Sequence, residues 1–117
     1  MSQHVLTVNL RDDPAAIATY REYHINVWPE VVERLRAVGV RRMDIHLLGR
    51  QLVMVVEVND GLDVRRVFEA HRQATGRVEE WERLMQSLQE PVAGAPDGEW
   101  WAVMEPVFQM ESHLTRS

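Results

Sequence analysis

The sequence predicts an α+β fold in which helices cover one face of an antiparallel sheet. Two observations indicate this fold. Strand and helix patterns follow one another in the order β-α-β-β-α-β, and the helical stretches carry apolar residues at three- and four-residue spacing. This order is typical of the split βαβ, ferredoxin-like fold. At 117 residues, we expect one domain over residues 1–117, with an ordered core over about residues 4–111.

The first strand is predicted over residues 4–10, where alternate residues are apolar. One long amphipathic helix should follow over residues 13–39. Asp13 suits its N-cap, Pro14 its first position, and the glycine at 39 its end. Pro29 cannot donate a hydrogen bond to the preceding turn, so we expect a kink in this helix.

Two strands are predicted in the middle of the chain, over residues 40–48 and 51–58. Gly49 begins the tight turn that joins them into a hairpin. The second strand is apolar on both faces except at Glu57, which predicts a central position in the sheet.

The second half of the fold should contain a helical region in two parts and a last strand. The helical patterns cover residues 62–74 and 77–89, and the strand pattern covers residues 99–110. Pro106 cannot donate a ladder hydrogen bond, which places this strand at a sheet edge or a bulge.

The sheet face without helices is expected to be too apolar to remain in water. On the last strand, the apolar residues of this face are Trp100, Ala102, Met104, Phe108 and Met110. Pairing of two sheets would cover them. We therefore expect a homodimer of the dimeric α+β barrel type.

Composition narrows the classes of function. The net charge is −5 and the basic residues are scattered arginines, which argues against nucleic-acid binding. No apolar run reaches the roughly 18 residues of a membrane span. The chain has no cysteine, which is compatible with a reducing, cytoplasmic location. No metal-ligand motif, phosphate loop or nucleophile elbow is present, so we expect neither a metal nor another cofactor.

His24 is the leading candidate for chemistry, because it lies in the apolar register of the first predicted helix. Tyr20 and Trp28 stand four residues to either side, so the three side chains should share one face. An imidazole beside a phenol and an indole suits acid/base work near neutral pH. A core histidine bonded to a backbone carbonyl or to Tyr20 remains the alternative.

Other polar and aromatic residues have weaker patterns. Trp81 lies on the apolar side of its helix, where it could stack on a sugar or simply pack. Glu57 should be paired with an arginine or act as an acid or base, and His46 should be exposed. Trp100 and Trp101 should point to opposite sides of their strand, one into the core and one toward a pocket or interface.

The run from Tyr20 to Glu30 resembles the Tyr-x-x-x-His-x-x-x-Trp-Pro-Glu signature of the L-rhamnose mutarotase family. Similar residues follow at Gly39, 44–47, 55–58, 81–85 and 107–108, so the resemblance covers about residues 4–110. It implies a dimeric ferredoxin-like barrel that interconverts the α and β anomers of 6-deoxy sugars. The partners implied are a monosaccharide substrate and a second copy of the chain.

The resemblance also implies roles for individual residues. The family's proton-donating histidine falls on His24 and its first substrate-contacting tyrosine on Tyr20. A second tyrosine falls on Met43, and a tryptophan pair falls on Trp81 and Glu82, so this chain departs from the family at two places. The opening residues and the strand around Met43 look more like the L-fucose branch.

The second proton-transfer group is open at this point, with Glu57, Glu82 or a water as candidates. L-rhamnose is the alternative substrate. A non-catalytic barrel that binds sugars or other small molecules and a cofactor-free monooxygenase of the same architecture are the alternatives from other classes.

Overall fold

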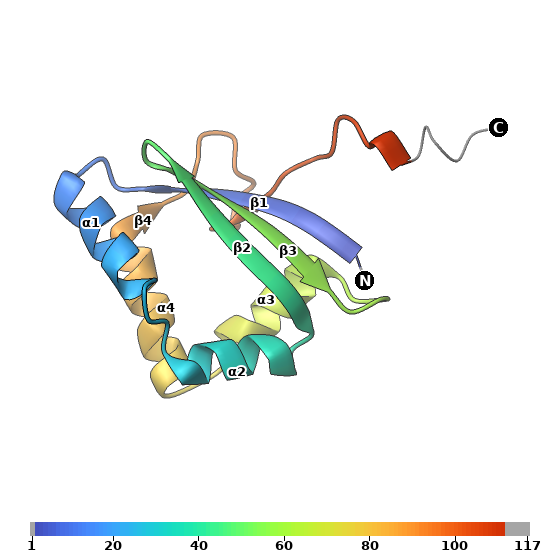
Figure 1. Ribbon diagram of the computed structural model, residues 1–117, viewed down its shortest axis with the longest axis horizontal. Helices are drawn as coiled ribbons and strands as arrows, with labels where there is room; N and C mark the ends of the chain where they lie inside the picture. The colour runs from blue at the N-terminus through green and yellow to red at the C-terminus, as the bar shows by residue number, and fades with distance from the viewer. Residues whose placement is uncertain (1, 112–117) are drawn as a thin grey trace.

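The computed structural model describes residues 2–111, so both ends of the predicted domain lie outside the described residues. It confirms an antiparallel sheet with helices on one face (Figure 1). The strand order is β2-β3-β1, with β4 and β5 both pairing with β1. The strands are β1 (Ser2–Leu10), β2 (Val40–Leu48), β3 (Gln51–Val58), β4 (Gln89–Glu90) and β5 (Ala102–Val103). The helices are α1 (Pro14–Tyr23), α2 (Pro29–Ala37), α3 (Val64–Arg72) and α4 (Arg77–Leu88).

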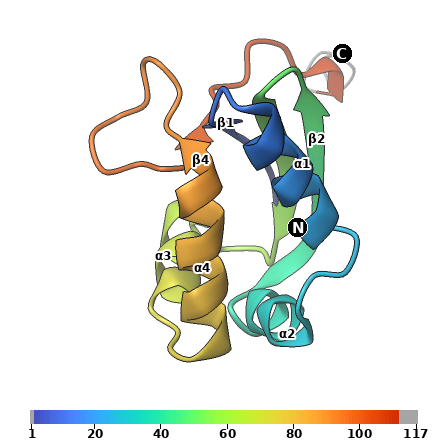
Figure 2. The ribbon, with the colours of Figure 1, turned by 90° about the vertical axis from the view of Figure 1, so that its left-hand side faces the viewer.

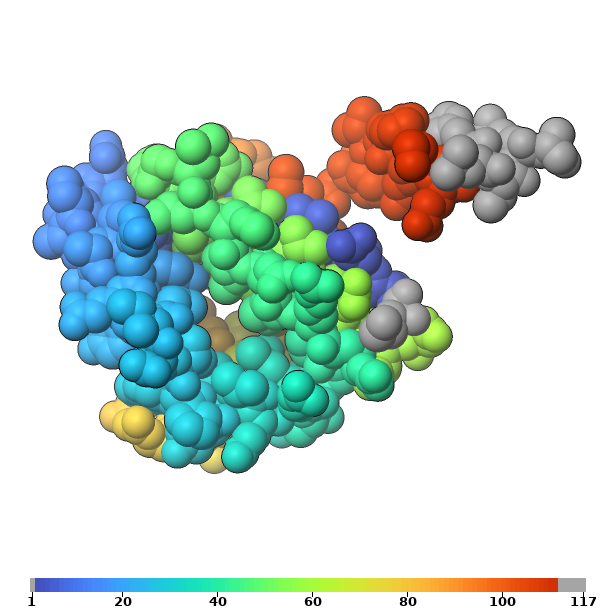
Figure 3. Space-filling model, in the orientation of Figure 1, coloured from blue at the N-terminus to red at the C-terminus, as the bar shows by residue number. Residues whose placement is uncertain are grey.

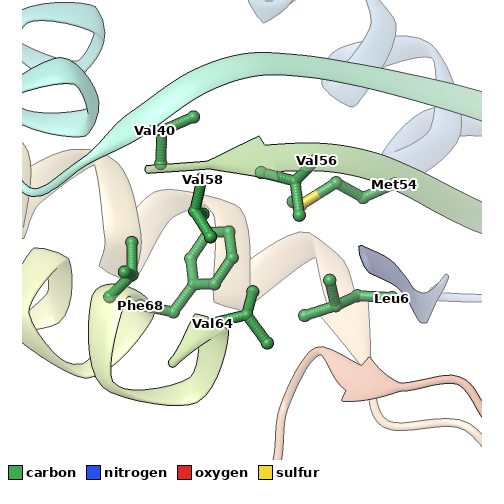
Figure 4. Close-up of a cluster of buried hydrophobic side chains, with 8 residues drawn as sticks. Leu6, Val40, Met54, Val56, Val58, Val64 and Phe68 are labelled. Atoms are coloured by element: carbon green, nitrogen blue, oxygen red, sulfur yellow. The ribbon is translucent and has the colours of Figure 1, made fainter. Parts of the chain in front are cut away.

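The core lies between the sheet and the helices. Along β3 every second residue is buried, from Leu52 to Val58, because the alternating side chains of a strand reach opposite faces. Phe68 and Val64 of α3 point toward this face of β3 (Figure 4). Helix α4 packs against α3, α1 and α2, so it forms the centre of the helical layer (Figure 2).

The prediction of one kinked helix over residues 13–39 is wrong, because α1 and α2 are separate helices. Pro29 is the first residue of α2, and Trp28 before it has ψ 132°, outside the helical region. The predicted start of α1 is confirmed, since Asp13 caps it by accepting a hydrogen bond from the Ala15 amide. Gly39 follows α2 with φ +112°, the left-handed region that favours glycine.

The prediction of a long last strand over residues 99–110 is also wrong. Only Ala102–Val103 pairs with β1, and the chain then leaves the body of the molecule (Figure 1). Val107 in this arm is 99% exposed. Pro106 lies beyond the two-residue strand, since it can supply no ladder hydrogen bond. The expected edge position is confirmed, because β4 and β5 lie at the side of β1 away from β3.

Candidate active site

A cavity of about 1610 Å³ opens between the helical face of the sheet and the helices. Figure 3 shows its mouth as a hollow between α1 and α2 on one side and β2 on the other. Typical small-molecule sites occupy roughly 300–1,000 Å³, so the cavity exceeds the needs of one monosaccharide. Its wall brings together the five residues to which the family resemblance gives a role: Tyr20, His24, Met43, Trp81 and Glu82.

His24 stands at the C-terminal end of α1, where the backbone carbonyls of the last turn lack helical partners. Its Nδ1 donates a hydrogen bond to the carbonyl oxygen of Tyr20 at 2.8 Å. The imidazole also stacks on the Tyr20 ring, with 4.1 Å between centroids. Because Nδ1 carries this proton, Nε2 is the nitrogen that can exchange a proton with a ligand.

Burial lowers the pKa of His24 below its ordinary value of 6.5, and the hydrogen bond to Tyr20 opposes this shift. The imidazole is therefore mostly neutral at pH 7, with Nε2 as its free acceptor. Its imidazolium form gives up a proton readily, as a general acid must.

Trp81 is the centre of an aromatic cluster beside His24. Its ring meets those of Tyr23, His24 and Trp28 edge-on, at centroid distances of 6.0, 5.4 and 5.1 Å. Arg77 covers the Trp28 ring with its guanidinium carbon 3.7 Å from the centroid. The sequence placed Trp28 on the same helix face as His24. In the structure Trp28 is the N-cap residue of α2, and the Trp81 ring contacts both the His24 and the Trp28 ring.

The hydroxyl of Tyr20 stays protonated throughout the physiological range. Burial raises its pKa strongly, a side-chain hydrogen bond with Gln89 opposes the rise, and the charge of Glu82 adds to it. Gln89 also accepts a hydrogen bond from Trp100 Nε1 at 2.9 Å. Tyr20 is thus suited to hydrogen bonding with a ligand rather than to releasing a proton.

Trp100 and Trp101 do not divide between the core and a pocket or interface as expected, and Trp100 does not lie on the helix-free face of the sheet. Both pack against the buried cluster around Trp81, and both line the cavity. Met43 lies on the helical side of β2, packs against the other buried cluster and lines the cavity from the sheet.

The site contains an imidazole that sequence reasoning missed. His71 of α3 is only 3% exposed, and its Nε2 lies 3.0 Å from Glu82 Oε1. The signal was present in the sequence, because His71 follows Val64, Val67 and Phe68 at the spacing of one helix face.

Glu57 is separated from this cavity. It lies beside Arg42 in the β2–β3 register and borders a small depression with Arg42, Asp44 and His46. Its strand neighbours Val56 and Val58 face the helical core, so Glu57 faces the opposite side of the sheet. His46 is exposed, as expected.

Within residues 2–111, no group of three or more His, Cys, Asp or Glu side chains is arranged to hold a metal ion. In the same range, no helix has the length and apolar character needed to cross a membrane.

The model of the L-rhamnose mutarotase family matches residues 3–110. The chain belongs to this family. Its members are isomerases that act on carbohydrates, and this chain is one of them. An L-fucose mutarotase from Xanthomonas campestris pv. campestris is 34% identical over an alignment 118 residues long, which covers 98% of this chain and 93% of the relative. A UPF0734 protein from Dictyostelium discoideum is 35% identical over 107 residues, covering 89% and 86%.

Solved structures support the fold of this family member. An L-rhamnose mutarotase from Formosa agariphila superposes with a TM-score of 0.66 at 19% identity, covering 94% of this chain and 99% of the other. The tetracenomycin F2 cyclase of Streptomyces glaucescens, a type-II polyketide cyclase, gives a TM-score of 0.60 at 17% identity, covering 93% and 96%. The fold alone therefore does not select a reaction.

Proposed function

We propose that the protein is a mutarotase that interconverts the α and β anomers of a 6-deoxy-L-hexose, with L-fucose as the favoured substrate. The observation that carries the proposal is His24. Its Nδ1 is anchored to a backbone carbonyl, and the imidazole lies in the wall of a cavity that also contains a phenol and an indole. L-Rhamnose is the second candidate substrate, because the family model carries that name.

Mutarotation needs two coordinated proton transfers. One group gives a proton to the ring oxygen while another takes the proton of the anomeric hydroxyl, which opens the ring to an aldehyde. Rotation about the bond between the first two carbons, followed by closure, yields the other anomer. His24 exchanges the ring-oxygen proton, because a histidine imidazole titrates near neutral pH; its lowered pKa favours the neutral form and makes the imidazolium a stronger acid.

The remaining cavity residues suit a deoxy sugar. Aromatic Trp81 offers a face or edge to the sugar C–H groups, and Met43 offers an apolar contact to the methyl group. Tyr20 and Glu82 supply hydrogen-bonding groups for sugar hydroxyls.

The functional unit in this proposal is a homodimer. The sheet face opposite the helices carries partly exposed Val5, Val53 and Val55. The arm that follows β5 adds the exposed side chains of Val107 and Met110. Such an apolar surface favours association with a second copy. Light scattering during size exclusion should give twice the 13.6 kDa mass of the chain, and a single-chain mass would contradict this part. The cytoplasmic location stays a prediction.

Saturation-transfer NMR on the anomeric protons of L-fucose and L-rhamnose tests the activity directly. We expect catalytic amounts of protein to accelerate exchange, and to do so more for L-fucose. Folded protein that accelerates neither sugar but perturbs their resonances would favour the non-catalytic binding alternative. Oxygen consumption with flat aromatic compounds, and no effect on sugars, would favour the monooxygenase alternative.

A further inference from the structure

A carboxylate and an imidazole form a second polar pair in the cavity wall, apart from His24. Glu82 of α4 and His71 of α3 are joined by the 3.0 Å contact between Oε1 and Nε2. The His71 side chain is 4% exposed and the Glu82 side chain 28% exposed. Both residues line the cavity, and the carboxylate is the more exposed of the two.

The surroundings of His71 indicate where the protons lie. Its Nδ1 is buried and has no hydrogen-bond partner among residues 2–111. A charged imidazolium would leave a buried N–H unpaired there, which costs more than leaving a neutral nitrogen unpaired. The favoured arrangement is a neutral His71 whose Nε2–H donates to Glu82, which leaves the carboxylate ionised and able to accept another proton.

Glu82 lines the same cavity as the groups proposed to touch the sugar. It follows Trp81 directly on α4, and the Trp81 ring contacts the His24 ring. Burial is the main cause of the raised pKa of Tyr20, and the charge of Glu82 contributes to it.

The other carboxylate considered from the sequence is on the wrong side of the sheet. Glu57 faces away from the helices, toward Arg42. Glu82 shares one cavity with His24. The resemblance to the family places a tryptophan where this chain has Glu82.

We propose that Glu82 is the second proton-transfer group of this site and that His71 positions it. This assignment rests on the proposed mutarotase activity. On ring opening, Glu82 takes the proton of the anomeric hydroxyl, and the electrons of that O–H bond form the carbonyl. The bond between the anomeric carbon and the ring oxygen breaks as the His24 imidazolium protonates that oxygen. On closure the ring oxygen attacks the carbonyl carbon and returns its proton to His24, while the carbonyl oxygen takes the proton held by Glu82.

The test is anomer exchange by Glu82→Gln, which keeps the size of the side chain and removes the base. A positioned acid or base contributes about 10²–10⁴-fold, so kcat should fall by that factor while KM changes less than about threefold. Glu79→Gln is the matched control, because Glu79 lies on the same helix and pairs with Arg83. It should keep the wild-type kcat.

His71 requires variants that separate positioning from folding. His71→Ala should lower kcat, and His71→Gln, whose amide can donate to Glu82, should recover most of the loss. Equal activity of these two variants would overturn the positioning role.

The outcomes separate this inference from the proposed function. Wild-type protein without exchange activity would refute both. Active wild type together with a folded Glu82→Gln variant within threefold of it would overturn only the role of Glu82. If Glu82→Gln does not fold, Glu82→Asp replaces it. This variant keeps the charge but withdraws the carboxylate by more than about 1 Å, a displacement that can cost on the order of 10²-fold. An Asp variant with the wild-type kcat would overturn the proposal as well.

Discussion

Replacement of His24 by asparagine is the most direct test of the chemistry. Asparagine places an amide N–H near the position of Nδ1, so it can keep the hydrogen bond to the Tyr20 carbonyl, but it cannot exchange protons. We expect kcat for L-fucose anomer exchange to fall by about 10²–10⁴-fold, the usual contribution of a positioned acid or base. At 1.36 kcal/mol per tenfold, this corresponds to about 2.7–5.4 kcal/mol of transition-state stabilisation.

The same substitution should leave the protein folded. It removes the stacking on Tyr20 and the edge contact with Trp81, which are worth about 0.5–1.5 kcal/mol each. The resulting loss of about 1–3 kcal/mol is smaller than the roughly 5–15 kcal/mol of a typical domain. Denaturant unfolding measures this loss, and exchange NMR measures kcat. His4→Asn is the matched control, because the His4 side chain bonds to Ser2 and lies outside the cavity wall. Folded His24→Asn with a rate within twofold of the wild type would refute the assignment of His24.

Three further predictions test neighbouring parts of the structure. NMR titration should give His24 a pKa below 6.5. The folded state then binds this proton more weakly than the unfolded state, so the contribution of neutral His24 to stability is present above pH 6.5 and is lost as pH falls. Unfolding of the wild type and of His24→Asn at pH 7.5 and pH 5 should show that loss. Tyr20→Phe should raise KM by about 2–13-fold in steady-state exchange assays, the equivalent of about 0.5–1.5 kcal/mol for one hydrogen bond, and should change kcat less. An unchanged KM would exclude sugar contact by this hydroxyl. Gly39→Ala should destabilise the protein by about 1 kcal/mol or more in urea unfolding, because φ is +112°, where a residue with a Cβ is strained, and the Leu62 side chain would also have to move away from the new Cβ; unchanged stability would contradict this local geometry.

Local patterns in the sequence predicted the fold well wherever one physical rule dominated. The hairpin over residues 40–58 follows from alternation and from Gly49, and β2 and β3 have the predicted bounds. The prediction of a long last strand was wrong because it followed an apolar alternation that continues past Pro106. Strand pairing also requires a neighbouring strand edge with the right register. Only Ala102 and Val103 meet that requirement on β1. Such non-local pairing cannot be read from a short window of sequence.

For the candidate site, the sequence predicted the position of His24 better than its surroundings. The helical spacing identified Tyr20 and His24 as neighbours, and they stack. Trp28 is instead the N-cap residue of α2, because Pro29 begins this separate helix. The pair of His71 and Glu82 joins α3 to α4, and its formation depends on how these helices pack, which no motif within either helix specifies.

The side chain at position 43 on β2, where this chain departs from the family, should influence substrate preference. Met43 lines the cavity where the resemblance places a second tyrosine, and the cavity of about 1610 Å³ has room for the larger ring. Met43→Tyr adds a hydroxyl that can bond to a sugar hydroxyl for about 0.5–1.5 kcal/mol. We therefore expect the ratio of kcat/KM for L-rhamnose to that for L-fucose to rise by about 2–13-fold in paired exchange measurements. Because both sugars share the reaction chemistry, general damage to the site would lower both rates together. An unchanged ratio would mean that the side chain at position 43 does not contribute to the choice of sugar.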